Sequence, residues 1–301
     1  MDSLFKDYPI GAVLLWRTKE RLLNERNLGH FFLPEPTKDY PVDYVLDGQQ
    51  RLTSIFSVFQ TELIPKDFLQ KELHLYSLSY IPYPAMIVSL VKFFGTDKIG
   101  GQLYNDKQRK QLIKWFWKSC FSRRYSSGVN NAHQTDLNAM KKLRENEDTD
   151  ISSFKCDISE SFFTDNQFNI NSVNTKTFIA LLASKTPRSF ISGAKVDLAT
   201  TLKLSSSKEF HHIFPDKYLQ RLGRERRDIY QLANFCFLNN ADNQKIKDKA
   251  PDEYAKYINP ESVSEVLCAA ICPENTFELS YDEFIDKRKK MLKDYAKSLI
   301  D

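Results

Sequence analysis

Hydrophobic and polar positions repeat with recognisable periods along several parts of this 301-residue chain. Residues 42–46 form a short run with strand character, and residues 52–59 are apolar at the spacing of a helix. Residues 85–94 predict an apolar helix, and residues 106–142 carry a helical pattern. Residues 281–300 predict an amphipathic helix with Lys and Arg on one face, packed on the C-terminal core.

The intervening segments are more polar and predict connections between these elements. We expect loops in residues 145–174, a short helix at 178–184, and a loop or linker at 187–203. The patterns together predict an α+β chain in three consecutive parts, of which the middle part is mainly helical. The expected boundaries are 1–95, 96–200 and 201–301.

Composition places the chain among folded proteins, with 42% hydrophobic and 13% aromatic residues. No apolar run is long enough to span a bilayer, so we expect a cytoplasmic protein without a membrane partner. The five cysteines are scattered and predict reduced thiols rather than a zinc knuckle. Cys268 and Cys272 are four apart and are expected on the same side of a helix.

The net charge of +4 is small, but the basic residues cluster. Residues 105–145 contain ten Lys or Arg against three acidic residues, with aromatic residues between them. This pattern favours either a DNA-backbone surface that includes Arg123 and Arg124, or a helix with an aromatic core face and a solvated basic face. A second cluster of arginines lies further on, at Arg221, Arg224, Arg226 and Arg227.

A histidine pair, His211 and His212, ends an apolar run and is followed by Ile-Phe-Pro. Asn234 and Asn243 come 22 and 31 residues after His212, on an expected turn and helix. Hydrolysis of a phosphodiester with a metal ion needs such groups: one imidazole to activate water and further side chains to hold a divalent cation. The alternative is a packed strand end with asparagines that cap helices or occupy turns.

The order and spacing of these residues resemble the HNH nuclease motif, also called the ββα-metal fold. The resemblance implies that His211 is a metal ligand, His212 the general base, and Asn234 a residue that orients the base by hydrogen bonding. Asn243 would complete the metal shell, with Mg²⁺ or Mn²⁺ expected. Lys245 and Lys247 follow on the same helix and are candidate DNA-backbone contacts.

A second motif lies upstream, at Asp47, Gly48, Gln49, Gln50 and Arg51. It joins the expected strand to the expected helix through a tight turn, which presents backbone N–H groups and a positive dipole end to an anion. Arg51 can bind a phosphate through two hydrogen bonds. The alternative is a capped turn with solvated polar residues.

The two motifs together resemble the GmrSD family of restriction proteins and their phosphorothioate-sensing relatives in anti-phage defence. That resemblance implies a ParB/sulfiredoxin-like domain that uses a nucleoside triphosphate and an HNH domain that cuts DNA, often modified DNA. The chain starts downstream of the family's first strand, so we expect a shortened domain with an exposed N-terminal edge for a partner subunit or a second copy. Further segments carry the resemblance, at residues 2–5, 8–11, 14–17, 121–127 and 243–254.

The sequence thus predicts a metal-dependent DNA endonuclease of a nucleotide-regulated, modification-dependent or anti-phage restriction system. A non-catalytic DNA-binding or nucleotide-switch module built on an HNH scaffold is the alternative, and RNA cleavage is a third hypothesis. Metal dependence of the activity discriminates the first from the second, because a scaffold needs no divalent cation.

Overall fold

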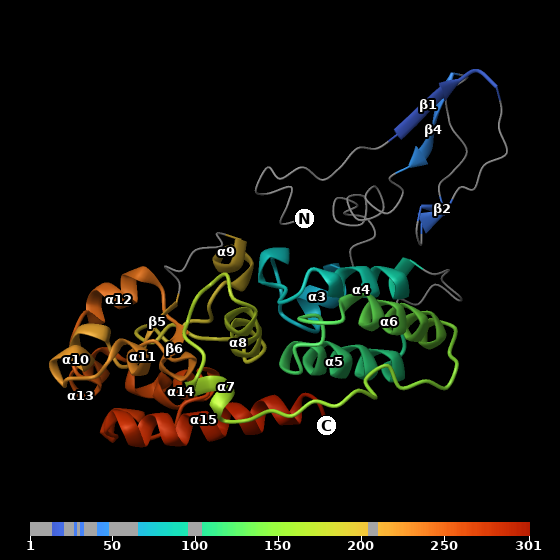
Figure 1. The fold of residues 1–301 in the computed structure, drawn as a ribbon. Helices are drawn as coiled ribbons and strands as arrows, with labels where there is room; N and C mark the ends of the chain where they lie inside the picture. The colour runs from blue at the N-terminus through green and yellow to red at the C-terminus, as the bar shows by residue number, and fades with distance from the viewer. Residues whose placement is uncertain are drawn as a thin grey trace. The chain divides into compact units, whose positions relative to one another are not determined.

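The computed structural model describes residues 14–20, 27–28, 31–32, 41–47, 66–95, 104–203 and 210–301. Within these residues the chain is mainly helical, with three antiparallel sheets of two strands each, which confirms the predicted α+β class (Figure 1). The chain forms two compact units, each assembled from separated stretches. The first comprises Met1–Pro65, Ala85–Asn105 and His133–Thr149, and the second comprises Lys66–Pro84, Asp106–Ala132 and Asp150–Asp301.

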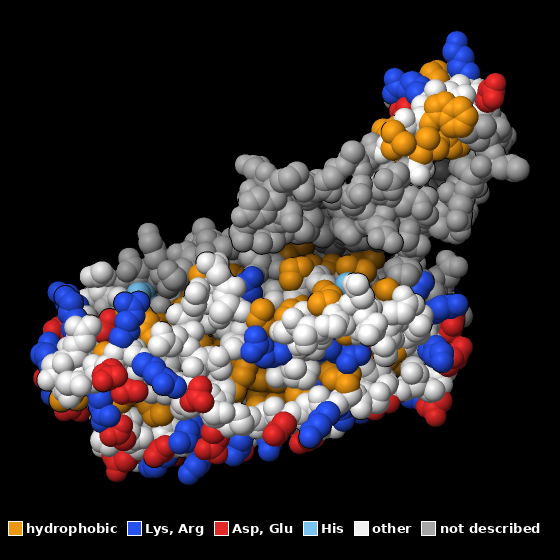
Figure 2. All heavy atoms as spheres, in the orientation of Figure 1, with side chains coloured by type: hydrophobic (Ala, Val, Ile, Leu, Met, Phe, Trp, Pro, Cys, Tyr) orange, Lys and Arg blue, Asp and Glu red, His pale blue; other side chains and the backbone are white. Residues whose placement is uncertain are grey.

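In the first unit, strand β1 (Leu14–Thr18) pairs antiparallel with β4 (Val42–Asp47), and this confirms the strand predicted at 42–46. Arg17 and Asp43 lie opposite each other and form two hydrogen bonds of 2.8 Å. Large apolar side chains of this hairpin are nevertheless exposed (Figure 2), namely Leu14, Leu15, Trp16 and Leu46. Among the described side chains of this hairpin none is buried, and backbone pairing and an exposed ion pair hold the two strands together.

Among its described residues, the same unit also contains a second short hairpin and helical segments. Strand β2 (Asn27–Leu28) pairs with β3 (Phe31–Phe32). Helix α4 (Ala85–Gly95) confirms the apolar helix predicted at 85–94, and it buries Met86, Leu90 and Phe93. Helix α6 (Val129–Arg144) contributes its part from His133 onward, and His133 Nε2 lies 2.9 Å from the carbonyl of Ala85. The guanidinium of Arg144 lies over the ring of Phe93.

In the second unit, α5 (Asp106–Phe121) supplies much of the core. Trp115, Phe116 and Trp117 are successive residues and all are at most 1% exposed. The aromatic residues of α5 thus form a core face, as one interpretation of residues 105–145 predicts, and contact of the basic residues with a DNA backbone stays a prediction. The helical region predicted at 106–142 is interrupted after α5, where Arg123 and Gly128 adopt positive φ angles.

Helix α8 (Val173–Ala183) packs near α5 and begins five residues earlier than the helix predicted at 178–184. The hydroxyl of Ser172 caps it by accepting a hydrogen bond from the amide of Thr175, so the polar residues before Phe178 are its first turn. The segment predicted as a linker at 187–203 contains helix α9 (Leu198–Lys203), which the side chain of Asp197 caps.

Short elements complete the second unit. They are α3 (Lys66–Lys71), η1 (Leu78–Tyr80), α7 (Ser161–Thr164), α10 (Asp216–Arg221), α11 (Arg226–Ile229), η4 (Leu232–Asn234), α12 (Asn240–Ile246), α13 (Pro251–Tyr254), η5 (Ala255–Tyr257), η6 (Pro260–Ser262), α14 (Val263–Ala269) and η7 (Thr276–Glu278), with strands β5 (Phe210–His212) and β6 (Phe235–Phe237). Cys268 is exposed on α14, whereas Cys272 is buried beyond the end of that helix, so the prediction that both face the same side of a helix is wrong.

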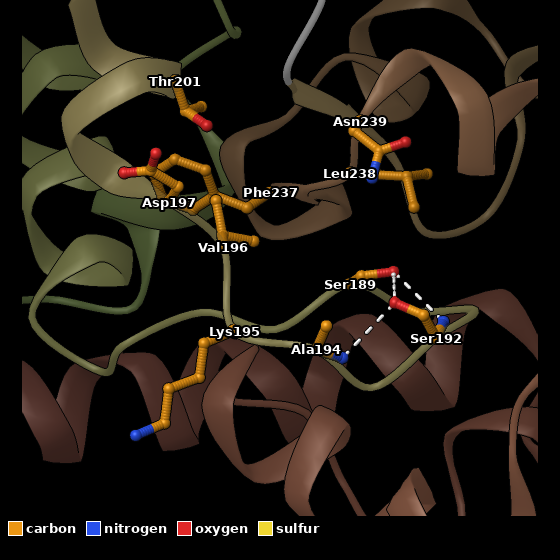
Figure 3. Close-up of a pocket in the computed structure, with 10 residues that line it drawn as sticks. All are labelled: Ser189, Ser192, Ala194, Lys195, Val196, Asp197, Thr201, Phe237, Leu238 and Asn239. Carbon is orange, nitrogen blue, oxygen red and sulfur yellow. Dashed lines mark hydrogen bonds between the residues drawn. The ribbon is translucent and has the colours of Figure 1, made fainter.

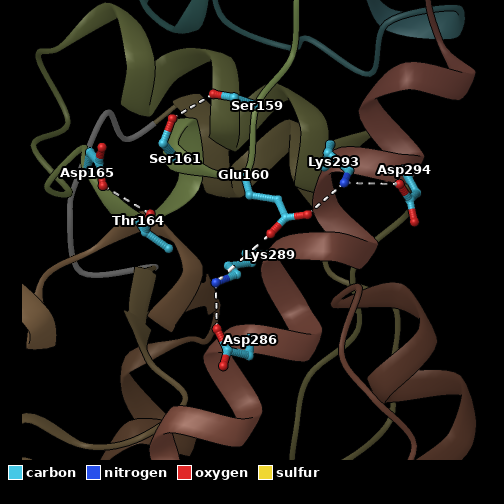
Figure 4. A network of polar contacts seen from close by, with 9 residues as sticks. All are labelled: Ser159, Glu160, Ser161, Thr164, Asp165, Asp286, Lys289, Lys293 and Asp294. Atoms are coloured by element: carbon cyan, nitrogen blue, oxygen red, sulfur yellow. Dashed lines mark hydrogen bonds and ion pairs between the residues drawn. The ribbon is translucent and has the colours of Figure 1, made fainter.

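Helix α15 (Tyr281–Ser298) confirms the amphipathic helix predicted at 281–300. Ser280 and Glu283 form a capping box at its start. Lys289 and Lys293 reach Glu160, the N-cap of α7, with the Lys293 ammonium 2.6 Å from the carboxylate (Figure 4). These lysines keep the pKa of Glu160 below its usual value. Helix α15 therefore packs on the C-terminal core and also anchors α7.

Candidate functional site

The histidine pair lies on a two-stranded hairpin within the second unit. Strand β5 pairs antiparallel with β6, so that His211 is opposite Cys236 and His212 is opposite Phe235. Successive side chains of a strand point to opposite faces, so the two imidazoles lie on opposite faces of the hairpin. Both histidines are partly buried, and β6 is buried along its whole length.

The imidazole of His212 lies among aromatic rings. Its centroid is 4.1 Å from that of Phe235 and 4.8 Å from that of Tyr230. Its Nε2 is buried and has no hydrogen-bond partner among the described residues. Burial lowers the pKa of His212 to about 4, against the opposing charge of Asp216 and with a smaller contribution from His211. The ring is therefore neutral near pH 7, with one of its nitrogens unprotonated.

A carboxylate and a phenol accompany this imidazole. The hydroxyl of Tyr230 donates a 2.9 Å hydrogen bond to Asp216, which also accepts one from Gln220. Burial and Asp216 raise the pKa of Tyr230. Neither residue was predicted from the sequence. The position of Asp216 in the first turn after Pro215 was the available signal, because it lies only four residues from His212.

Asn234 is completely buried at the end of η4. Its Oδ1 accepts a 3.0 Å hydrogen bond from the amide of Phe214, and its Nδ2 donates to the carbonyls of Phe214 and Ile229 at 3.1 and 3.0 Å. Both amide hydrogens are thus used on the backbone. The Asn234 side chain thus fixes the backbone two residues after His212, and its role in orienting the base stays a prediction.

A buried arginine supports the same region from α15. Arg288 is 0% exposed and donates hydrogen bonds to four backbone carbonyls, those of Ala233, Phe235, Ala270 and Ile271. The first two carbonyls flank the buried asparagine on both sides. The sequence pattern placed Lys and Arg of this helix on one face, and it did not distinguish the buried Arg288 from the other basic residues.

The predicted metal ligands are His211 and Asn243. Asn243 lies on α12, whose N-cap is Asn239, and its side chain is partly buried. Among the described residues no group of three or more His, Cys, Asp or Glu is arranged to hold a metal ion. One imidazole and one amide fit a hard divalent cation that keeps several waters and takes substrate phosphate oxygens as further ligands. They do not form a closed structural site of the zinc type.

The upstream motif lies mostly outside the described residues. Asp47 is the last residue of β4, so the strand expected before the motif does end at this aspartate. Gly48, Gln49, Gln50 and Arg51 lie outside the described residues, and the nucleotide site stays a prediction.

The predicted DNA contacts differ in their surroundings. Arg123 is exposed, whereas the guanidinium of Arg124 stacks 3.9 Å from the ring centroid of Phe154. Lys245 is exposed in the last turn of α12. Lys247 is the C-cap residue with a φ of 54°, and so it lies just beyond the helix on which it was expected.

A pocket of about 210 Å³ lies next to β6 and α12 (Figure 3). The segment before α9, α9 itself and the end of β6 line it with both polar and apolar side chains. The Ser192 hydroxyl donates to that of Ser189, which in turn donates to Asp242 of α12. The segment predicted as a linker thus forms part of the wall beside the helix that carries Asn243.

Comparison with known sequences now identifies the class of protein. The family described as “GmrSD restriction endonuclease, N-terminal domain” matches residues 1–191, and the chain belongs to this family. The matched residues include Asp47–Arg51 but end before His211. Within the described residues, no helix has the length and apolar character needed to cross a membrane.

A curated relative gives a second comparison. The uncharacterized protein MJ0686 of Methanocaldococcus jannaschii is 26% identical over 216 residues, which is 70% of this chain and 33% of the relative. The chain thus spans about a third of the length of the curated relative it matches. No solved structure matches the chain.

Proposed function

We propose that this chain is a DNA endonuclease of a restriction or anti-phage defence system, with an HNH-type active site built on β5, β6 and α12. Membership of the GmrSD family supports the restriction role and DNA as the substrate. The observation that carries the catalytic part is His212, a neutral imidazole at the end of a hairpin whose following backbone is clamped by the buried Asn234.

His212 acts as the general base in this proposal. Its Nε2 is buried, so Nδ1 is the ring nitrogen that we assign to take a proton from water. The water oxygen attacks phosphorus, a P–O bond of the backbone breaks, and the leaving oxygen takes a proton from solvent. His211 and Asn243 would hold a divalent cation, Mg²⁺ or Mn²⁺, which stabilises the charge that develops on the phosphate and the leaving oxygen.

The remaining parts of the proposal concern substrate and regulation. The proposed DNA-backbone contacts are Lys245, Lys247, Arg123 and Arg124, and all of them except Arg124 are exposed. The segment Asp47–Arg51 would bind a nucleoside triphosphate that regulates cleavage. Asp47 ends a strand, as the proposed strand–turn–helix phosphate site requires.

Conversion of supercoiled plasmid to nicked or linear DNA tests the proposal. The full chain is assayed with Mg²⁺ or Mn²⁺ and with EDTA, with and without ATP or GTP, on modified and unmodified DNA. We expect metal-dependent cleavage that His212→Ala abolishes and that added imidazole partly restores. His211→Ala should instead shift the metal concentration needed for cleavage.

Lys217→Ala provides the control, since Lys217 is exposed on α10 and has no hydrogen-bond or ion-pair partner among the described residues. This variant should cleave like the wild type. Absence of cleavage by the wild type under every metal and on both DNAs would reject the nuclease and favour a DNA-binding or nucleotide-switch module.

A further inference from the structure

The four arginines before β6 are not equivalent in the folded chain. Arg221 binds Asp248 through its carboxylate and its carbonyl, at 2.5 and 2.6 Å. Arg224 binds the carboxylate of Asp282 at 2.5 Å. Two positive charges of this cluster are therefore neutralised by carboxylates that lie 27 and 58 residues away in the sequence. Such pairs leave these guanidiniums less able to bind another anion.

Arg226 has a different environment. It is exposed in α11, and its Cζ lies 4.7 Å from the ring centroid of Tyr230. No carboxylate of the described residues forms an ion pair with it, although Glu225 and Asp228 are close in sequence. The Tyr230 ring restricts the guanidinium by a cation–π contact, and no carboxylate in the described part of the chain binds its N–H groups.

The same tyrosine connects Arg226 with the candidate base. The Tyr230 ring is also in edge contact with the imidazole of His212, at 4.8 Å between centroids. Its hydroxyl is held by Asp216, which fixes the ring from the first turn of α10. A guanidinium and a neutral imidazole thus lie against one tyrosine ring whose own position is fixed.

We propose that Arg226 is a phosphate-binding residue of the active site, which binds a non-bridging oxygen of the scissile phosphodiester or its neighbour in the DNA backbone. The planar guanidinium matches phosphate oxygens through two parallel hydrogen bonds. This inference rests on the proposed function, because it places the substrate phosphate beside His212. It also assigns the other members of the cluster: Arg221 and Arg224 hold α10 and the following loop in place.

Arg227 is the matched control. It is exposed on the same short helix and carries the same charge, but it has no contact with Tyr230 and no ion pair among the described residues. A general effect of positive charge on DNA binding would make Arg226→Ala and Arg227→Ala equivalent. A site beside the base makes them different.

Plasmid cleavage is the first measurement. Arg226→Ala should lower kcat/KM by about 10- to 100-fold, as expected for the loss of a hydrogen bond to a charged group. Arg226→Lys should recover only part of this loss, because an ammonium lacks the planar fork. Arg227→Ala should stay within about threefold of the wild type, the range of a surface substitution. Equal activities of the two alanine variants would overturn the inference.

DNA binding supplies a readout that does not depend on cleavage. In the His212→Ala background, the affinity for a DNA duplex is measured as a function of salt. Adding Arg226→Ala should reduce the slope of log K against log salt by about 0.9, which is one phosphate contact. An unchanged slope would overturn the role of Arg226 even if the chain cuts DNA. A wild type that binds DNA but does not cut it would instead overturn the proposed function. Thermal melting curves of each variant show whether it is folded.

Discussion

Replacement of Asn234 tests whether its side chain acts on the backbone of the hairpin. Asn234→Ala removes three hydrogen bonds at a position that is 0% exposed. It leaves the Phe214 amide and the carbonyls of Phe214 and Ile229 without those partners. Each buried polar group left unsatisfied costs about 1–3 kcal/mol, so for these three groups we expect the free energy of unfolding to fall by about 3–9 kcal/mol. Asn234→Asp keeps the Oδ1 acceptor but places a carboxyl oxygen against the carbonyls of Phe214 and Ile229. This variant should be no more stable than Asn234→Ala.

Asn243 offers a matched control, because it is also an asparagine of the candidate site. It is partly exposed on α12, and its side chain forms no hydrogen bond among the described residues. Asn243→Ala should change the free energy of unfolding by less than about 0.5 kcal/mol, as is usual for a surface substitution. Its effect should fall on metal-dependent cleavage, since we propose the amide as a metal ligand.

Urea and thermal unfolding measure the difference between the two asparagines. For a unit of this size, 1 kcal/mol corresponds to about 2–4 °C in Tm, so Asn234→Ala should lower Tm by about 6 °C or more. A variant that unfolds at the temperature of the wild type would refute the backbone role. Loss of cleavage with an unchanged Tm in Asn234→Ala would instead indicate direct contact with the base or the substrate.

Three further predictions follow from other contacts. Arg288→Met should lower the free energy of unfolding by about 3 kcal/mol or more, because it removes the hydrogen bonds to four buried carbonyls. Lys290→Ala, at an exposed position of the same helix, should leave the free energy of unfolding unchanged. Equal urea midpoints for the two variants would contradict this prediction. The pKa of His212 is lowered by burial from 6.5 to about 4, so the unfolded chain binds a proton more readily. The contribution of His212 to the free energy of unfolding is therefore fully present above pH 6.5 and is lost as the pH falls toward 4. Urea unfolding with EDTA at pH 7.5 and 4.5 should therefore show a smaller acid loss in His212→Gln than in the wild type, and an equal loss would disprove the burial effect. Ser280→Ala should lower the free energy of unfolding by about 0.5–2 kcal/mol through loss of the capping box, whereas Ser298→Ala at the other end of α15 should change Tm little.

Local periodicity determined several elements of the fold. The apolar run became α4, the β-prone run before Asp47 became β4, and the amphipathic tail became α15. These predictions succeed because a helix or strand exposes its period in neighbouring residues. Residues 173–174 were predicted as loop and the helix was predicted to begin only at 178, although a serine cap and buried threonines make residues 173–177 the first part of α8.

For the candidate site, too, the sequence predicted some features and the structure revealed others. Residue type and spacing identified His211, His212, Asn234 and Asn243, and the structure places the two histidines on one strand and Asn243 on the helix after the next strand. Sequence spacing did not reveal that the Asn234 amide is used on the backbone, because that depends on where Phe214 and Ile229 lie in space. The function of each residue in cleavage stays a prediction.

Contacts between distant residues decided the remaining features. The sequence alone determined that the chain is an α+β protein with a GmrSD-type N-terminal region and where its charges lie along the chain. Only the tertiary structure separated the arginines into the buried Arg288, the paired Arg221 and Arg224, and Arg226, which forms no ion pair with a described residue. The physical reason is that charge is a property of a residue type, whereas burial and pairing depend on partners that the fold brings from other parts of the chain.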